Sequence, residues 1–382
     1  MLKHIVAVKL LDNFHQNSYF QHMLKTPESV KEMEGRAASS LKALIEQVPA
    51  IKLEDIKVEP SDTDQRVDIL AHLTVSDRHH VLVCEVKNSG QPRHVRMALL
   101  QLRNYVAHFG KEATPIFIAP YLSAEAQALC REHQVGFLDL EGNARLVFDG
   151  VFIERLVSSK PSTERRELRS LFKPKSAQVL RVMLRDPRRP WRVTELAETA
   201  GVSLGHVSNV RTGLLDREWG QVSDKGLFIS QPDALLDAWR DEYALPAGKR
   251  MSFYTTMHGS PFEEAARRVL DAGADKGRAV FASFSAAQWL APYGRTVTQY
   301  FYADNAGLEK LKIALNLSSV PKGENVMVAV PNDQGLFLDI VEPAPGAVCT
   351  GPIQTYLDLC VAGERGQEAA QHLRREKLTW QN

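Results

Sequence analysis

The sequence predicts a multidomain protein of the α/β and α+β classes, with domains at residues 1–157, 158–247 and 248–382. The chain has 382 residues, 44% of them hydrophobic, which is enough for two or three separate cores. Strand-like and helix-like segments alternate as far as Leu156, a pattern typical of an α/β domain. The polar segment VSSKPSTERRELRS then indicates a linker, and a second, helix-rich region follows it.

Composition and charge narrow the class of protein. The formal net charge is only +1, so the overall balance does not by itself predict a nucleic-acid partner. The four cysteines are far apart and form no CxxC pair, which argues against a disulfide framework or a zinc knuckle. The N-terminus lacks the features of a signal peptide, and no stretch reaches the ~20 apolar residues that span a membrane. We therefore expect a cytoplasmic protein without a membrane partner.

The elements expected in the first domain follow from periodicity and turn residues. A helix is expected first, then two strands that form a hairpin around the polar run SDRHH, and then a second helix. A strand, a third helix and a closing pair of strands complete the domain. The expected ranges are Pro27–Gln47, Arg66–Val75, Val81–Lys87, Pro92–His108, Pro115–Ala119, Ser123–His133, Gly136–Leu140 and Ala144–Ile153.

Two carboxylates and a lysine stand out on the expected hairpin. Side chains alternate along a strand, so Glu85 and Lys87 project from one face of the second strand. In the expected register, Asp68 on the first strand stands beside Glu85. Two converging carboxylates form an oxygen site suited to Mg²⁺, and a nearby lysine can orient water or stabilise charge on a phosphate. An ExK pattern alone is also common on solvated strand faces.

The following helix adds polar residues in a fixed relation to each other. Gln101 and Tyr105 are four residues apart and therefore share a face of the helix. Leu99, Leu102 and Val106 supply the apolar stripe that packs on the sheet.

Asp68, the run Glu85-Val86-Lys87 and the run Gln101 to Tyr105 occur in the order of a known pattern. The segment resembles the PD-(D/E)xK nuclease superfamily, and its last element resembles the QxxxY motif of the RecB-like branch. The resemblance implies a restriction-endonuclease-like fold and a phosphodiesterase that acts on DNA with Mg²⁺ or Mn²⁺. It also implies that Asp68 and Glu85 bind metal, that Lys87 is the catalytic lysine, and that Gln101 and Tyr105 belong to the site.

The same resemblance suggests a further acidic residue on the first helix. Glu34 is the candidate for a third metal ligand and Glu46 is its rival. Val67 stands where the superfamily often has proline. Some members of the superfamily keep the fold without catalysis, so a non-catalytic scaffold is the alternative. Asp139, near the closing strands, is explained by turn chemistry as well as by a metal site.

Positive charge is concentrated after the first domain. Between Lys160 and Arg192 there are eleven Lys or Arg and three Asp or Glu, so the local balance is 11 − 3, or +8. Such a stretch fits the phosphate backbone of DNA, whereas the simpler explanation is a solvated helix face.

A helix-turn-helix pattern follows, in WRVTELAETAGVSLGHVSNVRTGLLDREWG. Thr194 is the expected N-cap of the first helix, Gly201 supplies the turn, and Ser203 caps the second helix. Then GQVSDKGLFIS predicts a β-hairpin wing. This region resembles the winged helix-turn-helix of bacterial regulators, in which the second helix reads the major groove. The expected DNA contacts are His206, Asn209, Arg211 and Lys225, although some winged helices bind proteins instead.

The C-terminal third carries no catalytic motif. Its expected helices are Pro261–Ala272, Gly307–Leu315, Gln354–Val361 and Gly366–Lys377, and its expected strands are Ala279–Phe281, Val326–Val330 and Leu336–Val341. The run GPIQTYLDLCVAGERGQEAAQHLRRE resembles the C-terminal region of AbiEi-type antitoxins of type IV toxin–antitoxin systems. That resemblance implies a cognate nucleotidyltransferase toxin as partner and autorepression of transcription.

Two functions are therefore expected. The first is a Mg²⁺-dependent DNA nuclease that is targeted by the winged helix. The second is an AbiEi-like antitoxin and transcriptional regulator with a non-catalytic nuclease-like scaffold. A bacterial defence or mobile-element context suits either, and a homodimer is an arrangement that winged-helix regulators often adopt.

Overall fold

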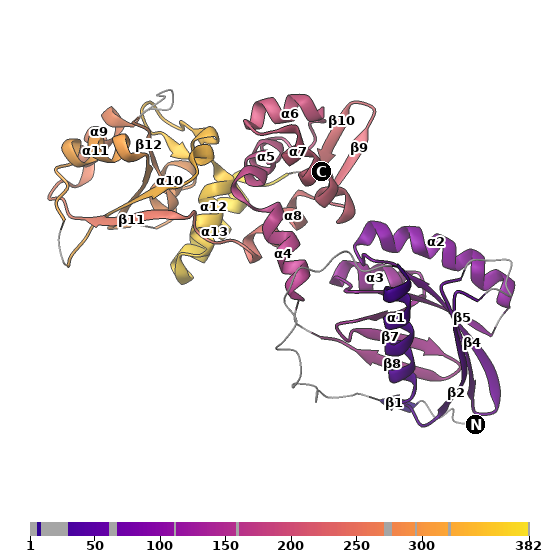
Figure 1. Cartoon of the computed structure of the whole chain (residues 1–382). Coiled ribbons are helices and arrows are strands. Elements are labelled where there is room, and N and C mark those ends of the chain that lie inside the picture. The colour runs from indigo at the N-terminus through magenta and orange to yellow at the C-terminus, as the bar shows by residue number, and fades with distance from the viewer. Residues whose placement is uncertain are drawn as a thin grey trace. The chain divides into compact units, whose positions relative to one another are not determined.

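The computed structural model describes residues 6–8, 30–60, 67–110, 112–157, 160–270, 277–294, 296–319 and 322–380. The chain divides into two compact units (Figure 1). The first unit comprises Met1–Glu164 with Asp216–Glu218, and the second comprises Arg165–Leu215 with Trp219–Asn382. Helices and strands mix in both, so the predicted fold class is confirmed. Residues 1–5 and 9–29 lie outside the described residues, and so does the start of the expected first helix, Pro27–Gln47.

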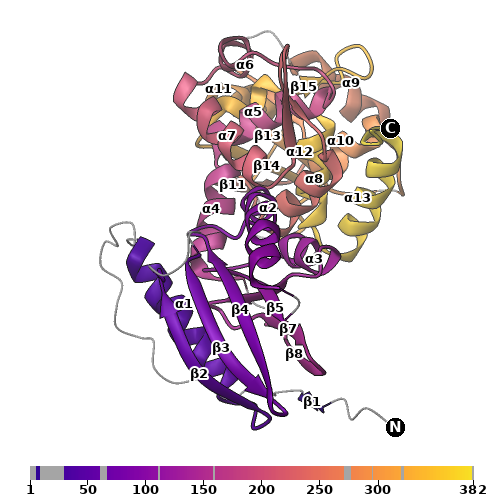
Figure 2. The ribbon, with the colours of Figure 1, turned by 90° about the vertical axis from the view of Figure 1, so that its right-hand side faces the viewer.

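One mixed sheet forms the centre of the first unit. Its strand order is β1-β8-β7-β6-β5-β4-β3-β2, and Figure 2 shows β2 to β5 side by side. Neighbouring strands are parallel at β1/β8, β4/β5 and β5/β6 and antiparallel elsewhere. The strands are β1 Val6–Val8, β2 Ile51–Val58, β3 Ile69–Val75, β4 Arg78–Val86, β5 Ala113–Ala119, β6 Gly136–Asp139, β7 Ala144–Phe148 and β8 Val151–Arg155.

Helices cover both faces of this sheet. Helix α1 (Val30–Ile45) buries Met33 and Leu41 in one apolar cluster that also contains Ile69 and Cys84. Helices α2 (Pro92–Phe109) and α3 (Ala124–Glu132) pack on a second cluster around Val83. Because Val83 and Cys84 are consecutive, their side chains point to opposite faces and separate the two clusters. The apolar stripe expected on α2 is confirmed, since Leu99 and Leu102 are buried and Val106 is half-buried.

The predicted hairpin is β3–β4, closed by a tight two-residue turn. Val75 pairs with Arg78, and the two residues between them, Ser76 and Asp77, have φ values of 50° and 65°. Positive φ at both central positions matches the twist of antiparallel strands. Strand β2 was not predicted. Its pairing with β3 is irregular between Leu53 and Asp55, and this irregularity disrupts the alternation that would have revealed the strand.

The second unit begins with helices and a small hairpin. Helix α4 spans Ser162–Leu171, so most of the predicted linker is in fact helical. Leu168 and Leu171 are buried three residues apart, which explains why this polar segment folds. The next elements are α5 Pro174–Arg185, α6 Val193–Ala200, α7 Leu204–Asp216, β9 Gly220–Ser223, β10 Gly226–Ile229 and α8 Pro232–Asp241.

A second mixed sheet forms the rest of this unit, in the order β11-β14-β13-β12-β16-β15. Its strands are β11 Gly248–Phe253, β12 Ala279–Phe281, β13 Gln299–Ala303, β14 Val326–Pro331, β15 Ile340–Val341 and β16 Cys349–Thr350. The helices are α9 Gly259–Val269, α10 Ser283–Leu290, α11 Asn305–Ala314, the 3₁₀ helix η1 Gln334–Leu338, α12 Pro352–Cys360 and α13 Gly363–Lys377.

Sequence periodicity did not predict every element of this sheet. β11, α10 and β13 were missed. In the expected strand Leu336–Val341, residues 336–338 belong to η1 and only Ile340 and Val341 form a strand. Helix α9 ends at Val269, and residues 271–276 lie outside the described ranges. None of the helices in the described ranges has the length and hydrophobicity that crossing a bilayer requires.

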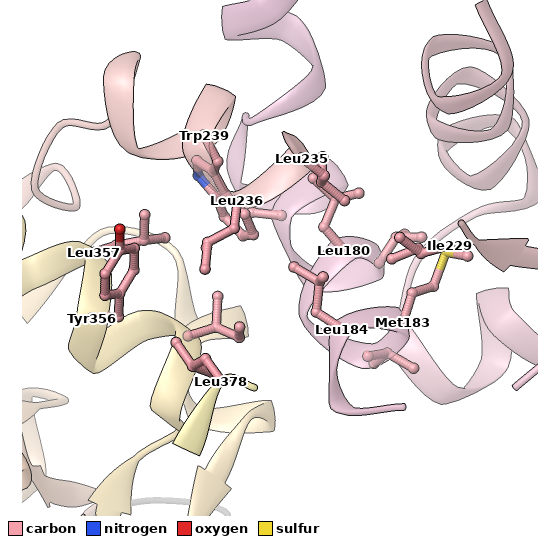
Figure 3. Packing of buried hydrophobic residues seen from close by; sticks show 14 of the residues in the cluster. Leu180, Met183, Leu184, Ile229, Leu235, Leu236, Trp239, Tyr356, Leu357 and Leu378 are labelled. Carbon is pink, nitrogen blue, oxygen red and sulfur yellow. The ribbon is translucent and has the colours of Figure 1, made fainter. Parts of the chain in front are cut away.

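A continuous apolar cluster lies within the second unit. It joins Leu180 and Leu184 of α5 to Trp239 of α8 and to Leu357 of α12. Figure 3 shows these side chains packed together with Leu378 near the C-terminus. The cluster contains residues from both sides of the predicted boundary between residues 247 and 248, and that division into two domains stays a prediction.

Candidate functional site

The two predicted carboxylates meet where β3 begins and β4 ends. Ile69 pairs with Cys84 in the antiparallel register, so the next position along brings Asp68 beside Glu85. The Asp68 Oδ2 atom accepts a hydrogen bond of 2.7 Å from the backbone N–H of Val86. This bond holds the Asp68 carboxylate against the end of β4, which carries Glu85 and is followed directly by Lys87. The structure thus brings the two acidic side chains together, as the sequence pattern predicts.

Glu34, on α1, is buried close to this pair. Glu34 and Glu85 are 3% and 2% exposed, and the Oε2 atom of each has no hydrogen-bond partner among the described residues. Burial raises the pKa of Glu34, and the charge of Asp68 raises it further. The rival residue, Glu46, is exposed and forms an ion pair of 3.8 Å with Lys42. Of the two candidates, Glu34 is buried within α1 and Glu46 lies exposed just after the helix, so the structure favours Glu34.

Lys87 is the cation of the cluster. Its Nζ forms an ion pair with Glu85 Oε1, and its side chain is half-buried. Burial raises the pKa of the Glu85 carboxyl, the hydrogen bond from Lys87 lowers it, and the charge of Asp68 raises it again. The pKa of Asp68 is likewise raised by burial and lowered by the hydrogen bond from Val86. Opposing effects of this kind concentrate at functional sites.

The two residues predicted on α2, Gln101 and Tyr105, differ in their relation to the carboxylates. Tyr105 is half-buried, and the charges of Glu85 and Asp68 add to the effect of burial in raising the pKa of its hydroxyl. Tyr105 therefore lies within electrostatic reach of both carboxylates. Gln101, one turn earlier, is exposed. Its part in the site stays a prediction.

The carboxylates of Glu34, Asp68 and Glu85 suit a metal ion such as Mg²⁺, which keeps several water ligands. In the described parts of the chain, no group of three or more His, Cys, Asp or Glu side chains is placed to hold a metal. Mg²⁺ is usually bound through one or two carboxylates and keeps several water ligands. The unpartnered Oε2 atoms of Glu34 and Glu85, with Asp68 between two strand ends, fit that chemistry. A cage built wholly from protein ligands does not fit, and Glu34 as a third ligand stays a prediction.

One acidic residue near the site was missed. The backbone N–H of Glu59 donates a 2.9 Å hydrogen bond to the carbonyl oxygen of Asp68, and the Glu59 charge raises the pKa of both Asp68 and Glu34. Glu59 follows β2, the strand that was not predicted, so no signal placed it here.

Asp139 has a structural explanation. Its carboxylate accepts hydrogen bonds from the backbone N–H groups of Leu122, Glu141, Gly142 and Asn143 and from the side chain of Asn143. These bonds use the carboxylate to hold a turn, as the turn-chemistry interpretation expects.

The helix-turn-helix pattern corresponds to α6 and α7. Gly201 has a left-handed φ of 62° and ends α6, and Val207, Val210 and Leu214 bury the inner face of α7. Thr194 is not the N-cap, because α6 begins at Val193 with Arg192 before it. β9 and β10 then form an antiparallel hairpin in which Ser223 pairs with Gly226.

The predicted DNA contacts lie on the outer side of these elements. His206 and Asn209 are exposed on α7, and Arg211 is half-buried. The Ser203 Oγ atom forms a hydrogen bond of 2.9 Å with His206 Nδ1, which orients the imidazole in the first turn of the helix. Lys225 is exposed at the tip of the hairpin.

Part of the basic stretch is neutralised inside the second unit. Arg181 is buried and donates a 2.6 Å hydrogen bond to Gln354 Oε1. Acidic partners face several other cations, in the pairs Arg169–Glu242, Lys175–Asp333, Arg185–Asp339 and Arg189–Glu195. The local excess of +8 therefore overstates the charge available to DNA. Ion pairing within the fold, which periodicity cannot show, accounts for the difference.

Comparison with known proteins identifies one region. Residues 228–379 match a family model described as "Transcriptional regulator, AbiEi antitoxin, Type IV TA system". The resemblance predicted for the C-terminal third is therefore confirmed. A search of curated proteins finds no significant match to the chain.

Similar solved structures include "Structure of EndoMS-dsDNA2 complex", with 24% identity, a TM-score of 0.24, and coverage of 35% of this chain and 52% of that one. Another is "crystal structure of a repair endonuclease from Pyrococcus abyssi", with 20% identity, a TM-score of 0.21, and coverage of 27% and 46%. A third, "Structure of EndoMS in apo form", has 19% identity, a TM-score of 0.20, and coverage of 27% and 45%. The chain spans about half the length of these proteins.

Proposed function

We propose that the first unit is a metal-dependent phosphodiesterase that cleaves DNA, and that the helix-turn-helix of the second unit selects the DNA. The observation that carries this proposal is the meeting of Asp68, Glu85 and Lys87 at the β3–β4 strand ends. The N–H of Val86 fixes Asp68 there, and one Glu85 oxygen is left without a partner. A buried acceptor without a partner costs about 1–3 kcal/mol, so the arrangement favours function over stability.

The residues have distinct roles in this proposal. Asp68 and Glu85 hold the metal, with Glu34 as a further oxygen donor. A bound Mg²⁺ supplies Lewis acidity and makes a coordinated water a better nucleophile. Lys87, paired with Glu85, orients the attacking water and stabilises negative charge on the scissile phosphate. Tyr105 and Gln101 position the DNA strand from α2.

Cleavage assays test this function. Supercoiled plasmid and linear single- and double-stranded DNA are incubated with Mg²⁺, Mn²⁺ or EDTA. Wild type should cut only with metal, Asp68→Asn should not cut, and Glu132→Gln, an exposed change on α3, should cut normally. Cutting by Asp68→Asn at the wild-type rate would exclude the site. If wild type itself never cuts while DNA binding persists, the first unit is a scaffold.

A second candidate is supported by a separate observation. The match of residues 228–379 to an antitoxin and transcriptional-regulator family favours autorepression, with a cognate nucleotidyltransferase toxin as a partner. The exposed side chains of α7 supply groups that read base edges in the major groove. Mobility-shift assays with the DNA upstream of the gene should show binding that Arg211→Ala weakens. Repression in a reporter strain that survives Arg211→Ala would exclude this mode of binding.

The two candidates are compatible. A regulator can carry a nuclease, and a nuclease can be held at a site by its DNA-reading unit. Asp68→Asn in the cleavage assay tests the first unit, and Arg211→Ala in the binding assay tests the second. Co-purification with a toxin encoded next to this gene, and the mass of the free protein in solution, would test the predicted partner and the homodimer.

A further inference from the structure

A pocket lies on the second sheet, away from the residues discussed above. Its lining includes Tyr300 and Tyr302 of β13 and Met327 and Ala329 of β14. Tyr300 pairs with Met327 and Tyr302 with Ala329, and strand alternation places all four on one face. These side chains form a mostly apolar wall. The cavity has a volume of about 170 Å³, which is smaller than the usual site for a drug-sized molecule and suits a single ring system.

The two faces of this sheet have different neighbours. Phe301, between the two tyrosines, contacts Phe262 of α9 with ring centroids 6.3 Å apart. On the opposite face, Phe284 of α10 lies 5.7 Å from Tyr300, and the Tyr302 hydroxyl reaches Asp358 of α12. The pocket therefore lies between the sheet and the helices α10 and α12, where Ser283 at the start of α10 lines it with a positive φ of 47°. Strained backbone of this kind clusters at ligand sites.

Asp358 is the one acidic residue among those that line the pocket, and it is 1% exposed. Its Oδ1 atom accepts hydrogen bonds from Tyr243 Oη at 2.5 Å, Gln354 Nε2 at 2.8 Å and Tyr302 Oη at 3.1 Å. Its Oδ2 atom has no hydrogen-bond partner among the described residues. Three donors thus hold the carboxylate through one oxygen, and the other oxygen is buried without a partner among the described residues.

A positive charge lies at the same pocket. Arg250 of β11 is exposed, lines the pocket, and donates a hydrogen bond of 3.1 Å to the carbonyl oxygen of Pro246. Its charge acts on the Tyr302 hydroxyl and opposes the rise in the pKa of that group. The pocket therefore has a buried acceptor at Asp358, an apolar wall, and an exposed cation at Arg250. A guanidinium of this kind suits carboxylate or phosphate groups.

We propose that this pocket binds a small molecule in which a planar heterocycle with an N–H donor is joined to an anionic group. The N–H donates to Asp358 Oδ2, the ring lies against Tyr300 and Met327, and the anion lies near Arg250. Because Asp358 is buried whereas Arg250 is exposed, the donor and the anion must lie on different parts of the ligand. Nucleoside monophosphates and indole acids such as tryptophan and indole-3-acetate share the required chemistry.

Calorimetric titration of the full chain with AMP, GMP, CMP, UMP, tryptophan and indole-3-acetate tests the proposal. At least one of these probes should bind with a dissociation constant below 1 mM, on the order of the weakest specific affinities. Binding by phosphates alone identifies a nucleotide site, and binding by indole acids alone identifies an indole site. Absence of binding by all six probes overturns the proposal.

Three variants locate the binding. Ala329→Leu adds bulk to the pocket wall and alters none of the residues that hydrogen-bond to Asp358, so it should abolish binding while the thermal midpoint is kept. Arg250→Gln should weaken binding of the anionic probe at least about fivefold and leave binding of its uncharged analogue, a nucleoside or indole-3-acetamide, unchanged. Arg268→Gln, an exposed change on α9, is the matched control.

Asp358→Asn should also abolish binding, and Ala329→Leu keeps the test valid if that variant does not fold. Wild-type affinity in both folded Ala329→Leu and Arg250→Gln proteins would show that the probe binds elsewhere and would overturn the proposal.

Discussion

The carboxylate of Asp68 is joined to the backbone N–H of Val86 by a hydrogen bond of 2.7 Å. Val86 lies between Glu85 and Lys87, so this one bond places Asp68, just before β3, beside Glu85 at the end of β4 and Lys87 directly after it. A backbone donor cannot be removed by mutation of a side chain. The relative position of the three groups is therefore a property of the hairpin, which its two-residue turn keeps in register.

Glu34 and Glu46 should respond differently to loss of charge. Glu34 is buried beside the carboxylates of the site, whereas Glu46 is exposed and paired with Lys42. We expect Glu34→Gln to weaken Mn²⁺ binding about tenfold, within the range for lost supporting groups at metal sites. Glu46→Gln should leave it unchanged. Calorimetric titration with Mn²⁺ measures both, and equal affinities for the two variants would remove Glu34 from the site.

Variants of exposed residues on α7 and on the β9–β10 hairpin should distinguish contacts with bases from contacts with phosphates. Asn209→Ala should weaken binding to the specific site by about 1–3 kcal/mol and leave non-specific binding unchanged. Lys225→Ala should weaken binding to all sequences and reduce the slope of log affinity against log salt by about 1. Fluorescence anisotropy over a range of salt measures both effects, with Asn305→Ala and Lys249→Ala as exposed controls. A normal specific affinity in Asn209→Ala would exclude its contact with a base.

A side chain at Gly335 should displace the buried amide of Gln178. A Cβ atom at this position would lie 1.2 Å from Nε2 of Gln178, which is buried and donates to Asp333 at 3.2 Å. Gly335→Ala should therefore lower the free energy of unfolding by about 1–3 kcal/mol, as overpacking does. In a Gln178→Ala background the penalty should shrink, because the obstructing amide is gone.

Urea unfolding of the four proteins of this cycle measures the coupling. Strict additivity of Gly335→Ala and Gln178→Ala would contradict the predicted clash.

Gly35→Ala, in α1 with open space around its Cβ position, should by contrast stabilise the protein by about 0.5–1 kcal/mol, measured by the same urea unfolding.

Asp358 should make stability depend on pH. Burial raises its pKa to about 6, while hydrogen bonds from Tyr243, Gln354 and Tyr302 and the charge of Arg181 oppose the rise. A pKa above the unfolded value means that the native state favours the protonated acid. The contribution of Asp358 to the free energy of unfolding should then be largest below about pH 4, fall between about pH 4 and pH 6, and level off above that.

The expected loss between pH 4 and pH 7, relative to Asp358→Asn, is roughly 3 kcal/mol. Urea unfolding of both proteins across this range measures the difference. Curves for wild type and variant that run parallel would show that Asp358 titrates normally.

The sequence predicted those features of the fold and of the site that depend on local residue patterns. The hairpin, the position of Asp68 beside Glu85 and the buried stripe of α2 follow from alternation and helical spacing. Other features depend on contacts between distant segments. The irregular pairing of Leu53 and Asp55 hid β2 and with it Glu59. The ion pair of Arg185 with Asp339 joins residues more than 150 positions apart, so no local pattern revealed that the basic stretch is partly neutralised.

The central claim is that Glu85 holds a catalytic metal, and one comparison tests it most directly. This comparison measures the rate of Mg²⁺- or Mn²⁺-dependent cleavage of duplex DNA by wild type and by Glu85→Gln. DNA affinity and stability in urea are measured on the same samples. The predicted result is a loss of at least about 100-fold in rate, with DNA affinity unchanged and stability equal or higher, because a buried acidic group is removed. Equal cleavage rates for the two proteins would contradict the account.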